Sequence, residues 1–501
     1  MIQQFRAFLQ SDRRLQAWLL AGLAIQLVIA FTATGSYHPD QHFQIIEFSS
    51  YQLGQSHGAA AVWEFYNPVR PTIQIYLFSG WHQLITALGI SNPYTELTLL
   101  RLLLGLMMFV VFSGVTIFYL KNAPRKILYT ALAILNFSCF LPYFKVQFSS
   151  EILSALFFFG TLVWYDYKKD RQPGFAFLAW IGFLFCLAFY FRFQVGFFLV
   201  GFGIWLIWVA KKPRHILPMA IGFIAGAALN TWLDYLFFHK LEITPYLYYY
   251  INIIDKRAAM FGTSSFLRYI GLIIAVVSVP PVSLVLFFFA VKALFRNYRQ
   301  VLFLTTMAFI LAHCFVGHKE ERFLFPALFV LPIWIAWGLP EFFRVYDSPV
   351  AVWRYLIRGI TYISIGLNML LLVLLALNPY SQSIHFTEQI NDELESRGGG
   401  KLYYLHRSPF ETPAGSPYIF SQRYFSKTEF VRVNQYDSVA VLGPSPVYIA
   451  TTFDDFDGRR KADSAGFRPI LYSSDLLWSI NEKLAAAKMQ PINDIWVLYK
   501  K

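Results

Sequence analysis

Charge is scarce in this chain, and cysteine is almost absent. Of 501 residues only 14% are charged, whereas soluble globular proteins carry about 25%. Hydrophobic residues make up 56% and gather in long runs such as 270–291 and 323–337. The three cysteines (Cys139, Cys186 and Cys314) lie in apolar runs and fit neither a disulfide framework nor a zinc site. The composition excludes an ordinary soluble enzyme and predicts a polytopic membrane protein.

The charges that are present divide the chain into two parts. The tail, 381–501, holds 14 basic and 14 acidic residues and is neutral. The first 380 residues hold 28 basic and 15 acidic residues, and therefore the whole net charge of +13. We predict a multi-span membrane domain at 1–378 and a small soluble α/β domain at 379–501.

Hydropathy predicts about 11 transmembrane helices. Their ranges are 15–34, 99–120, 127–144, 151–166, 174–191, 193–210, 216–236, 268–291, 301–316, 323–340 and 356–377. The run 72–90 is ambiguous, because it carries polar residues. If it does not span, 18 basic and only five acidic residues share one side of the membrane. The positive-inside rule makes that side the cytoplasm. This places the N-terminus inside, the tail outside, and 72–90 in a surface or re-entrant helix.

Polar and ionisable residues then collect beside the spans on the outer face. They are His38, Asp40, Gln41, Glu47, Glu64, Arg70, Glu151, Arg192, His318, Lys319, Glu320 and Arg322. Ionisable groups near the bilayer are costly, so their default interpretation is functional. Interleaved acids and bases predict a site for a phosphorylated, polar ligand. Arginine would hold the phosphate and a carboxylate would move a proton.

Several of these features also have structural interpretations, which the residues alone leave open. The charges of 318–323 could pair with one another as a solvated loop. Asp40 could cap the helix that follows it. The tyrosines of 246–250 could form an interfacial aromatic belt or a sugar platform. Residues 454–458 could suggest a calcium loop, but the EF-hand spacing is not met, which favours a polar turn.

Five short segments of the outer face resemble a known family. They are HPDQHFQ at 38–44 with Glu47, WEF at 63–65 with Arg70, VQFSSE at 146–151, RF at 192–193 and HKEERF at 318–323. In this order they resemble the polyprenyl-phosphate-mannose-dependent α-mannosyltransferases, which build GPI anchors and asparagine-linked oligosaccharides. The chain departs from the family at Gln41, where Glu is usual, and at Gln147, where Arg is usual.

The resemblance implies a GT-C membrane fold and an inverting glycosyltransferase. The sugar, most simply mannose, would pass from a polyprenyl phosphate to a hydroxyl of a lipid-linked or membrane-anchored glycan. Asp40 is implied as the catalytic base. Donor phosphate binding is implied for Arg192, His318, Lys319 and Arg322. Support of the acceptor or of the arginines is implied for His38, Gln41, Glu47, Glu64, Arg70, Glu151 and Glu320.

The expected partners are therefore the lipid-linked donor, the glycan acceptor and the bilayer, without nucleic acid. A lipid phosphate donor needs no metal to hold a diphosphate, so no cofactor is expected. The large neutral tail is more typical of a bacterial relative, which would place the protein in the inner membrane. A secondary transporter or lipid flippase is the rival class. It predicts charged residues near the bilayer midplane and inverted repeats, whereas here the charges lie at span ends.

The tail pattern predicts a mixed α/β domain. Expected helices cover 384–397 and 475–488, and expected strands cover 401–405, 438–442, 448–452, 469–472 and 494–498.

Overall fold

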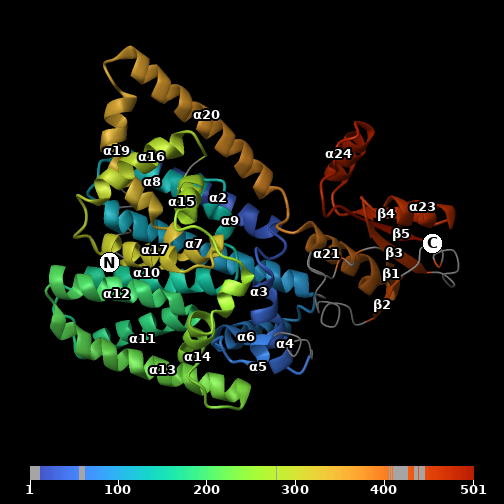
Figure 1. Ribbon diagram of the computed structural model, residues 1–501, viewed down its shortest axis with the longest axis horizontal. Helices are drawn as coiled ribbons and strands as arrows, with labels where there is room; N and C mark the ends of the chain where they lie inside the picture. Colours follow the sequence, from blue (N-terminus) through green and yellow to red (C-terminus); the bar gives the residue numbers. More distant parts are fainter. Residues whose placement is uncertain are drawn as a thin grey trace. The chain divides into compact units, whose positions relative to one another are not determined.

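The computed structural model of the chain describes residues 12–55, 63–277, 279–405, 407, 409, 427–433, 438 and 446–501. These residues are mostly helical, with a five-stranded sheet near the C-terminus (Figure 1), which confirms the predicted fold class. They form two compact units. The first draws on Met1–Phe31, Trp63–Leu77 and Leu100–Asn378, and the second on Thr32–Val62, Phe78–Leu99 and Pro379–Lys501. The boundary expected after Asn378 coincides with a unit boundary, and two earlier segments group with the tail.

The first unit is built from helices. They are α2 (Arg13–Thr32), α5 (Trp63–Tyr66), α6 (Ile73–Ala87), α7 (Pro93–Leu120), α8 (Arg125–Phe137), α9 (Leu141–Phe144), α10 (Ser150–Lys168), α11 (Phe175–Phe191), α12 (Gly196–Ile204), α13 (Ile216–Phe238), α14 (Thr244–Tyr249), α15 (Arg268–Val277), α16 (Val282–Leu294), α17 (Val301–Phe315), α18 (Phe325–Leu328), α19 (Leu331–Tyr346) and α20 (Ala351–Ala376). Short 3₁₀ or π turns link them at η3 (Phe193–Val195), η4 (Trp205–Val209), η5 (Pro213–His215), η6 (Tyr250–Ile254), η7 (Arg257–Phe261) and η8 (Glu321–Leu324). Both α6 and α7 continue from one unit into the other. Figure 1 shows α10 to α13 as a stack of roughly parallel helices.

Several of these helices have the length and apolarity of membrane spans. Within the described residues, four single helices are long and apolar enough to cross a membrane. They are Arg13–Thr32, Pro93–Leu120, Pro213–Phe238 and Ala351–Ala376. Two further helical segments, Glu321–Leu328 and Leu331–Tyr346, meet at an angle of 65° and would form a fifth span if they are taken as one broken helix. Shorter apolar helices cover Phe175–Phe191, Phe193–Val209, Val282–Leu294 and Val301–Phe315. The protein is therefore a multi-pass membrane protein, and the count of about 11 spans stays a prediction.

Three runs predicted as continuous spans are interrupted in the structure. The run 127–144 breaks between α8 and α9, 268–291 breaks between α15 and α16, and 323–340 breaks between α18 and α19. Proline lies at or beside each break: Pro142 and Pro332 near the start of α9 and α19, and Pro280–Pro281 before α16. Proline has no N–H and clashes with the preceding turn, so a helix ends or restarts there. An average of hydropathy over the run does not reveal these helix breaks.

The ambiguous run 72–90 forms one helix of 15 residues, α6. At about 1.5 Å per residue it is too short for a hydrocarbon core of about 30 Å. This agrees with a surface or re-entrant position, which stays a prediction.

Glycines bring α11 and α13 into close contact. A Cβ on Gly182 would lie 1.9 Å from the Met219 carbonyl oxygen, and one on Gly222 would lie 1.7 Å from the Ala179 carbonyl oxygen. Small residues permit this backbone approach, which is the usual way in which membrane helices gain packing contacts. Arg192 follows the last residue of α11, ten residues after Gly182.

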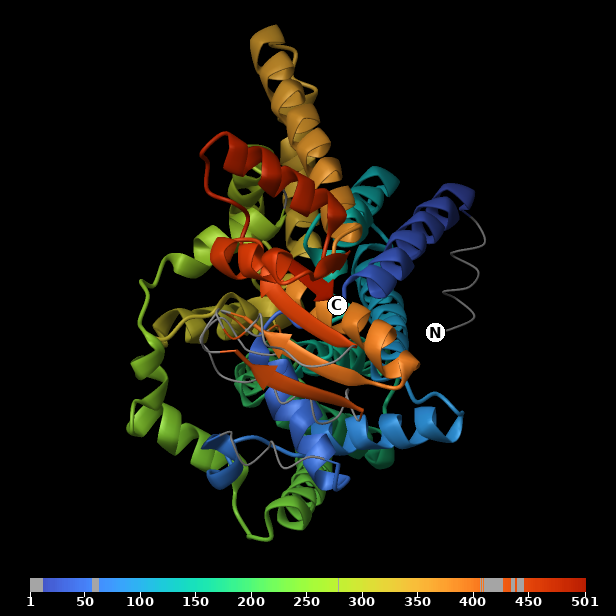
Figure 2. The ribbon, with the colours of Figure 1, turned by 90° about the vertical axis from the view of Figure 1, so that its right-hand side faces the viewer.

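The second unit contains the described part of the loop that follows α2, and the tail. Its elements are α3 (Pro39–Gln41), the π-helix η1 (His42–Glu47), α4 (Phe48–Gln52), α21 (Gln382–Leu394), η9 (Glu395–Arg397), β1 (Gly400–Tyr404), β2 (Thr428–Arg432), β3 (Val447–Thr452), α23 (Phe456–Ser464), β4 (Arg468–Tyr472), α24 (Asp475–Ala486) and β5 (Trp496–Lys500). The strand order is β2-β1-β3-β5-β4 (Figure 2). The pairs β1–β2 and β1–β3 are parallel, whereas β5 is antiparallel to β3 and β4.

Alternating side chains give this sheet two buried faces. Tyr448 and Ala450 of β3 pack on one face with α21, whereas Val447 and Ile449 pack on the other with residues of α23 and α24. This is the period of two that a strand imposes. The tail is therefore a three-layer α/β/α domain.

The tail predictions can be compared element by element. Both predicted helices and the strands at 401–405, 448–452 and 469–472 are confirmed within two or three residues. The last strand, β5, lies two residues later than predicted, and β2 was not predicted. The predicted strand 438–442 lies outside the described residues except for Ser438. The polar turn at 454–458 is instead the start of α23, where Asp455 accepts a hydrogen bond from the Gly458 N–H at 3.0 Å.

The loop that follows α2 is attached to the tail within this unit. The Ser381 N–H donates to the Thr34 carbonyl at 3.1 Å, and the rings of Tyr37 and Tyr380 meet edge to face at 5.7 Å. Tyr94, at the start of α7, donates its hydroxyl to Thr387 of α21 at 2.8 Å. The chain segment that carries Asp40 is thereby anchored at its start by α21 and the residues before it.

Candidate active site

Glu151 and Arg192 form a buried ion pair in the first unit. Ser149 caps α10, with its hydroxyl accepting from the Ile152 N–H at 3.4 Å, so Glu151 lies in the first helical turn. Arg192 follows the last residue of α11. A carboxylate at a helix N-terminus and a cation at a helix C-terminus are each favoured by the helix dipole. Arg192 Nη1 donates to Glu151 Oε1 at 2.6 Å and to Ser150 Oγ at 3.2 Å. Both charged side chains are at most 3% exposed.

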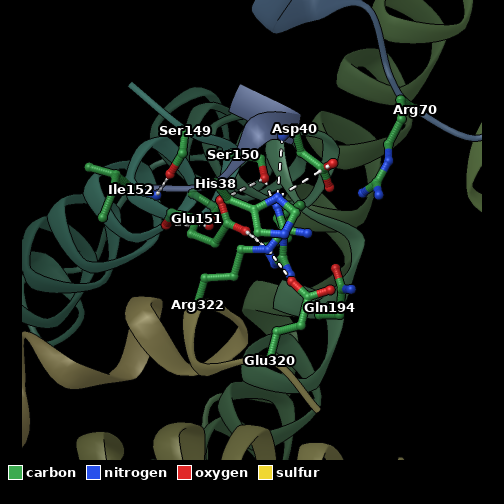
Figure 3. A network of polar contacts seen from close by, with 12 residues as sticks. His38, Asp40, Arg70, Ser149, Ser150, Glu151, Ile152, Gln194, Glu320 and Arg322 are labelled. Carbon is green, nitrogen blue, oxygen red and sulfur yellow. Dashed lines mark hydrogen bonds and ion pairs between the residues drawn. The ribbon is translucent and has the colours of Figure 1, made fainter. Parts of the chain in front are cut away.

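Arg322 extends this pair into a cluster. It lies in η8, and its Nε is 3.9 Å from Glu151 Oε1 and hydrogen-bonded to Glu320. Figure 3 shows Ser150, Glu151, Arg322 and Glu320 pointing toward one another. Because Arg322 is only 7% exposed, the interpretation of 318–323 as a solvated charge run is wrong.

His318 supports Glu320 from the other side. Its Nε2 is 2.9 Å from Glu320 Oε1, and its Nδ1 is 2.9 Å from the Gly262 carbonyl oxygen. The ring therefore lies between the Glu320 carboxylate and the Gly262 carbonyl and fixes the position of Glu320.

Lys319 behaves differently from its neighbours. Its ammonium donates to the carbonyl oxygens of Ser264 (3.3 Å) and Val316. The side chain therefore links two loops and has at most one donor left for a phosphate. Its predicted role as a phosphate ligand stays a prediction.

Arg70 and Glu64 form a second ion pair in this unit. Arg70 Nε lies 3.3 Å from Glu64 Oε1, and its guanidinium faces the Tyr248 ring at 5.6 Å. Arg70 and Arg192 line the same pocket. The four cations Arg70, Arg192, Lys319 and Arg322 outnumber the three carboxylates of Glu64, Glu151 and Glu320 by one. Such a cluster suits an anionic ligand.

The second unit holds the other predicted site residues. Asp40 lies inside the first turn of α3 rather than at its cap, and its backbone N–H donates to His38 Nδ1 at 3.2 Å. The alternative that Asp40 caps the next helix is therefore not what the structure shows. Gln41 is buried beside it. Figure 3 also shows the His38–Asp40 pair.

Glu47 is buried deeper in the same segment. In the π-helix η1 its Oε1 lies 2.9 Å from His42 Nε2, and both side chains are fully buried. A π-helix places residues five apart on one face, and such turns are frequent at functional sites. Because its side chain is fully buried, Glu47 is placed to support its own loop. Its predicted role toward the acceptor stays a prediction.

Several polar residues of the first unit were not among the predicted site residues, although Tyr248 belongs to the tyrosine run 246–250 considered above. Gln74, Gln194 and Tyr248 line the pocket with Arg70 and Arg192. Asp234 is buried and accepts hydrogen bonds from the Thr72 N–H, the Thr72 hydroxyl and the Thr244 hydroxyl, each at 2.8 Å. The signal available in the sequence was a polar residue inside an apolar run, which is costly and usually has a purpose.

The fold has a counterpart among solved structures. ArnT from Cupriavidus metallidurans, bound to undecaprenyl phosphate, superposes with a TM-score of 0.53 over 97% of this chain and 98% of that chain. The sequences are 11% identical, so the likeness concerns the fold. It confirms the predicted GT-C architecture.

Fold and sequence together define an integral-membrane glycosyltransferase. The profile of the Alg9-like mannosyltransferase family matches residues 17–397, and the chain belongs to that family. Similar proteins include GPI mannosyltransferase 3 of Yarrowia lipolytica, 20% identical over 78% of this chain and 73% of the relative. GPI mannosyltransferase 3 of Candida albicans is 22% identical over 63% of this chain and 62% of the relative. The suspected family is confirmed, and nothing in these comparisons favours a transporter.

Proposed function

We propose that the protein transfers mannose from a polyprenyl phosphate to a hydroxyl of a lipid-linked or membrane-anchored glycan. The observation that carries this is the buried Glu151–Arg192–Arg322 cluster, in which two guanidinium groups flank one carboxylate. A sugar-bearing lipid phosphate is a monoanion, and guanidinium groups bind its oxygens through paired hydrogen bonds. The ArnT structure contains undecaprenyl phosphate, and the yeast relatives are named for GPI, a glycolipid. Both names are compatible with this donor and acceptor class.

The chemistry assigns different tasks to the two kinds of side chain. The acceptor oxygen attacks C1 of the sugar, the bond from C1 to the phosphate oxygen breaks, and the configuration at C1 inverts. The acceptor proton passes to a carboxylate, for which we propose Asp40. The lipid phosphate leaves as an anion and needs charge stabilisation rather than a proton. Arg192 and Arg322 would supply it, with His318 and Glu320 holding Arg322.

The remaining predicted residues act as supports in this proposal. Glu151 braces two arginines, Glu64 braces Arg70, and Glu47 braces the Asp40 loop through His42. His38 accepts the Asp40 N–H and orients that turn, with Gln41 packed beside it.

Reconstituted protein distinguishes transfer from transport. Purified protein in liposomes should convert radiolabelled polyprenyl-phosphate-mannose and a glycolipid extract into a labelled glycolipid. Movement of intact donor across the bilayer without a new product would instead support a flippase.

Replacing Arg322 should weaken the binding of the donor. Arg322→Ala removes charged hydrogen bonds worth about 1.5–3 kcal/mol, so donor Kd should rise about 10- to 100-fold. Arg322→Lys keeps the charge but loses the fork, and should fall between parent and Ala. Binding of the labelled donor to purified protein measures this.

Arg268→Ala is the matched control, because Arg268 forms an exposed pair with Glu321 at 2.5 Å in the neighbouring loop. Exposed pairs contribute about 0–1 kcal/mol, so donor Kd should change at most about fivefold. Equal effects of the two alanine variants would contradict the phosphate role of Arg322.

The proposed topology places the N-terminus in the cytoplasm and the site outside. A cysteine at Asn122 should be shielded from a membrane-impermeant thiol reagent in intact cells, and one at Ser396 should react. The native cysteines are buried, so background labelling should be low. Ser396 is preferable to Gly399, where φ is +86° and a Cβ would lie 2.0 Å from the Lys427 carbonyl oxygen. Labelling of Asn122→Cys from outside would reverse the assignment and place the site in the cytoplasm.

A further inference from the structure

The segment that carries Asp40 is bound to the tail through Thr34. The Thr34 hydroxyl donates to Glu388 Oε2 of α21 at 3.2 Å, and the Thr34 carbonyl oxygen accepts the Ser381 N–H at 3.1 Å. Thr34 is only 6% exposed. Its side chain and its backbone therefore both make hydrogen bonds to the tail, close to the start of α21.

Gly35 lies against the same part of the tail. Its φ is +112°, and a Cβ built on it would lie 2.9 Å from Ser381 Cβ and 3.0 Å from the Ser381 nitrogen. Glycine alone adopts this conformation readily and leaves room for Ser381. Ser381 is itself held in place, because its hydroxyl caps α21 by accepting the Ile384 N–H at 3.3 Å. The backbone at Thr34 and Gly35 is thus fitted to the helix start.

The far end of the segment is held by the part of α6 that belongs to the same unit. The hydroxyl groups of Ser49 and Ser79 share a hydrogen bond at 2.8 Å, and Ser79 also donates to Gln52. Asp40 therefore lies between two attachments. The attachment at Thr34 is the one that the tail provides, and only residues 35–39 separate Thr34 from Asp40.

A catalytic base depends on such attachments. Misplacing a reacting group by about 1 Å can cost about 100-fold in rate, so catalytic side chains need support from the residues around them. Residues 33–38 form neither helix nor strand. Their position must therefore come from contacts with other elements, and α21 supplies two hydrogen bonds and a close backbone contact.

We propose that the tail takes part in catalysis by positioning Asp40, with Thr34, Ser381 and Glu388 as positioning residues. The inference rests on the proposed function, because it takes Asp40 as the base. It assigns α21 an effect on the transfer step, and none on the binding of the donor.

Thr34→Val tests this, since valine has nearly the same shape but no hydroxyl. The single-turnover transfer rate should fall about 10-fold, because the base is less well placed. Donor Kd should stay at the parental value. Thr34→Ser keeps the hydroxyl and should transfer within about twofold of the parent.

Thr428→Val is the matched control. The Thr428 hydroxyl donates to Glu395 Oε1 at 2.8 Å, and Thr428 is 9% exposed. This is the same substitution at a buried hydroxyl that also donates to a glutamate of the tail. Thr428 lies in β2, so the variant should lower the unfolding temperature about as much as Thr34→Val and still transfer at the parental rate.

A double-mutant cycle separates positioning from a general structural effect. If Thr34 acts through Asp40, it has nothing left to position in Asp40→Asn. Adding Thr34→Val to Asp40→Asn should then slow transfer by less than about twofold. A structural effect would slow both backgrounds equally.

Four results would overturn the inference. They are a parental rate in Thr34→Val, a weakened donor Kd in that variant, an equal loss of rate in Thr428→Val, and a full 10-fold loss in the Asp40→Asn background. Two other results concern the proposed function and can be told apart from these. A parent that transfers no sugar refutes the proposed function, and parental transfer by Asp40→Asn refutes the base assignment. This inference fails in both cases.

Discussion

Asp40→Asn is expected to give a folded protein that binds donor normally and transfers sugar at least about 100-fold more slowly. Asparagine keeps the size of the side chain but has no basic oxygen for the acceptor proton. The α3 turn should survive, because the hydrogen bond that His38 accepts there comes from the backbone N–H of Asp40. The measurement is the single-turnover transfer rate, beside donor Kd and expression level.

Two further variants sharpen this prediction. Asp40→Glu keeps the base but moves it by about 1 Å, which can cost about 100-fold, so it should be intermediate at best. Asp457→Asn is the control, since this tail carboxylate is 72% exposed. It should transfer at the parental rate. Turnover of Asp40→Asn within a few-fold of the parent would remove Asp40 from the mechanism.

Glu151→Ala is expected to lower the free energy of unfolding by about 3–5 kcal/mol, because it leaves buried guanidinium charge without its carboxylate. Arg192 would lose its 2.6 Å partner and Arg322 its neighbour at 3.9 Å. Glu151→Gln can still accept from Arg192 but carries no charge, so it should fall between Ala and the parent. Thermal unfolding in detergent, with and without donor, measures the loss.

The control for this variant is Glu321→Ala. Glu321 pairs with Arg268 at 2.5 Å, but these side chains are 41% and 45% exposed. Such pairs contribute about 0.2–1 kcal/mol, so stability should change little. Equal stabilities of the two alanine variants would contradict a dry, buried cluster around Glu151.

The sequence predicted the membership of this cluster better than its geometry. Charge asymmetry placed Glu151, Arg192 and Arg322 on one face, and the structure brings them together because α10 begins where α11 ends. Their burial could not be predicted, since hydropathy treats a loop charge as solvated. Lys319 donates to the carbonyl oxygens of Ser264 and Val316. Only the tertiary fold brings Ser264 close to Lys319, so the sequence did not predict this contact.

Gln74 shows what pattern analysis does not recover. Its polarity was visible within an apolar run, but its orientation depends on α6 packing beside Arg192, and no local rule gives that direction. The helix breaks have a different cause. Pro142 and Pro280–Pro281 were visible as helix breakers, yet an apolar average over about 20 residues passes over them.

The tail was easier to predict because short apolar runs between polar segments mark its central strands. β3 is buried on both faces with residues of opposite parity in different layers, and its position was predicted within one residue. β2 was missed because its sequence, TEFVR, has only two apolar residues between charged ones.

Transfer of mannose from a polyprenyl phosphate can be measured directly in membranes. Membranes with and without the protein are given radiolabelled polyprenyl-phosphate-β-mannose, and the labelled product is isolated and its linkage determined. We expect a new glycolipid carrying an α-linked mannose only where the protein is present, and we expect this product to be lost in Asp40→Asn. Unchanged donor, free mannose alone, or a β-linked product would contradict the proposed function.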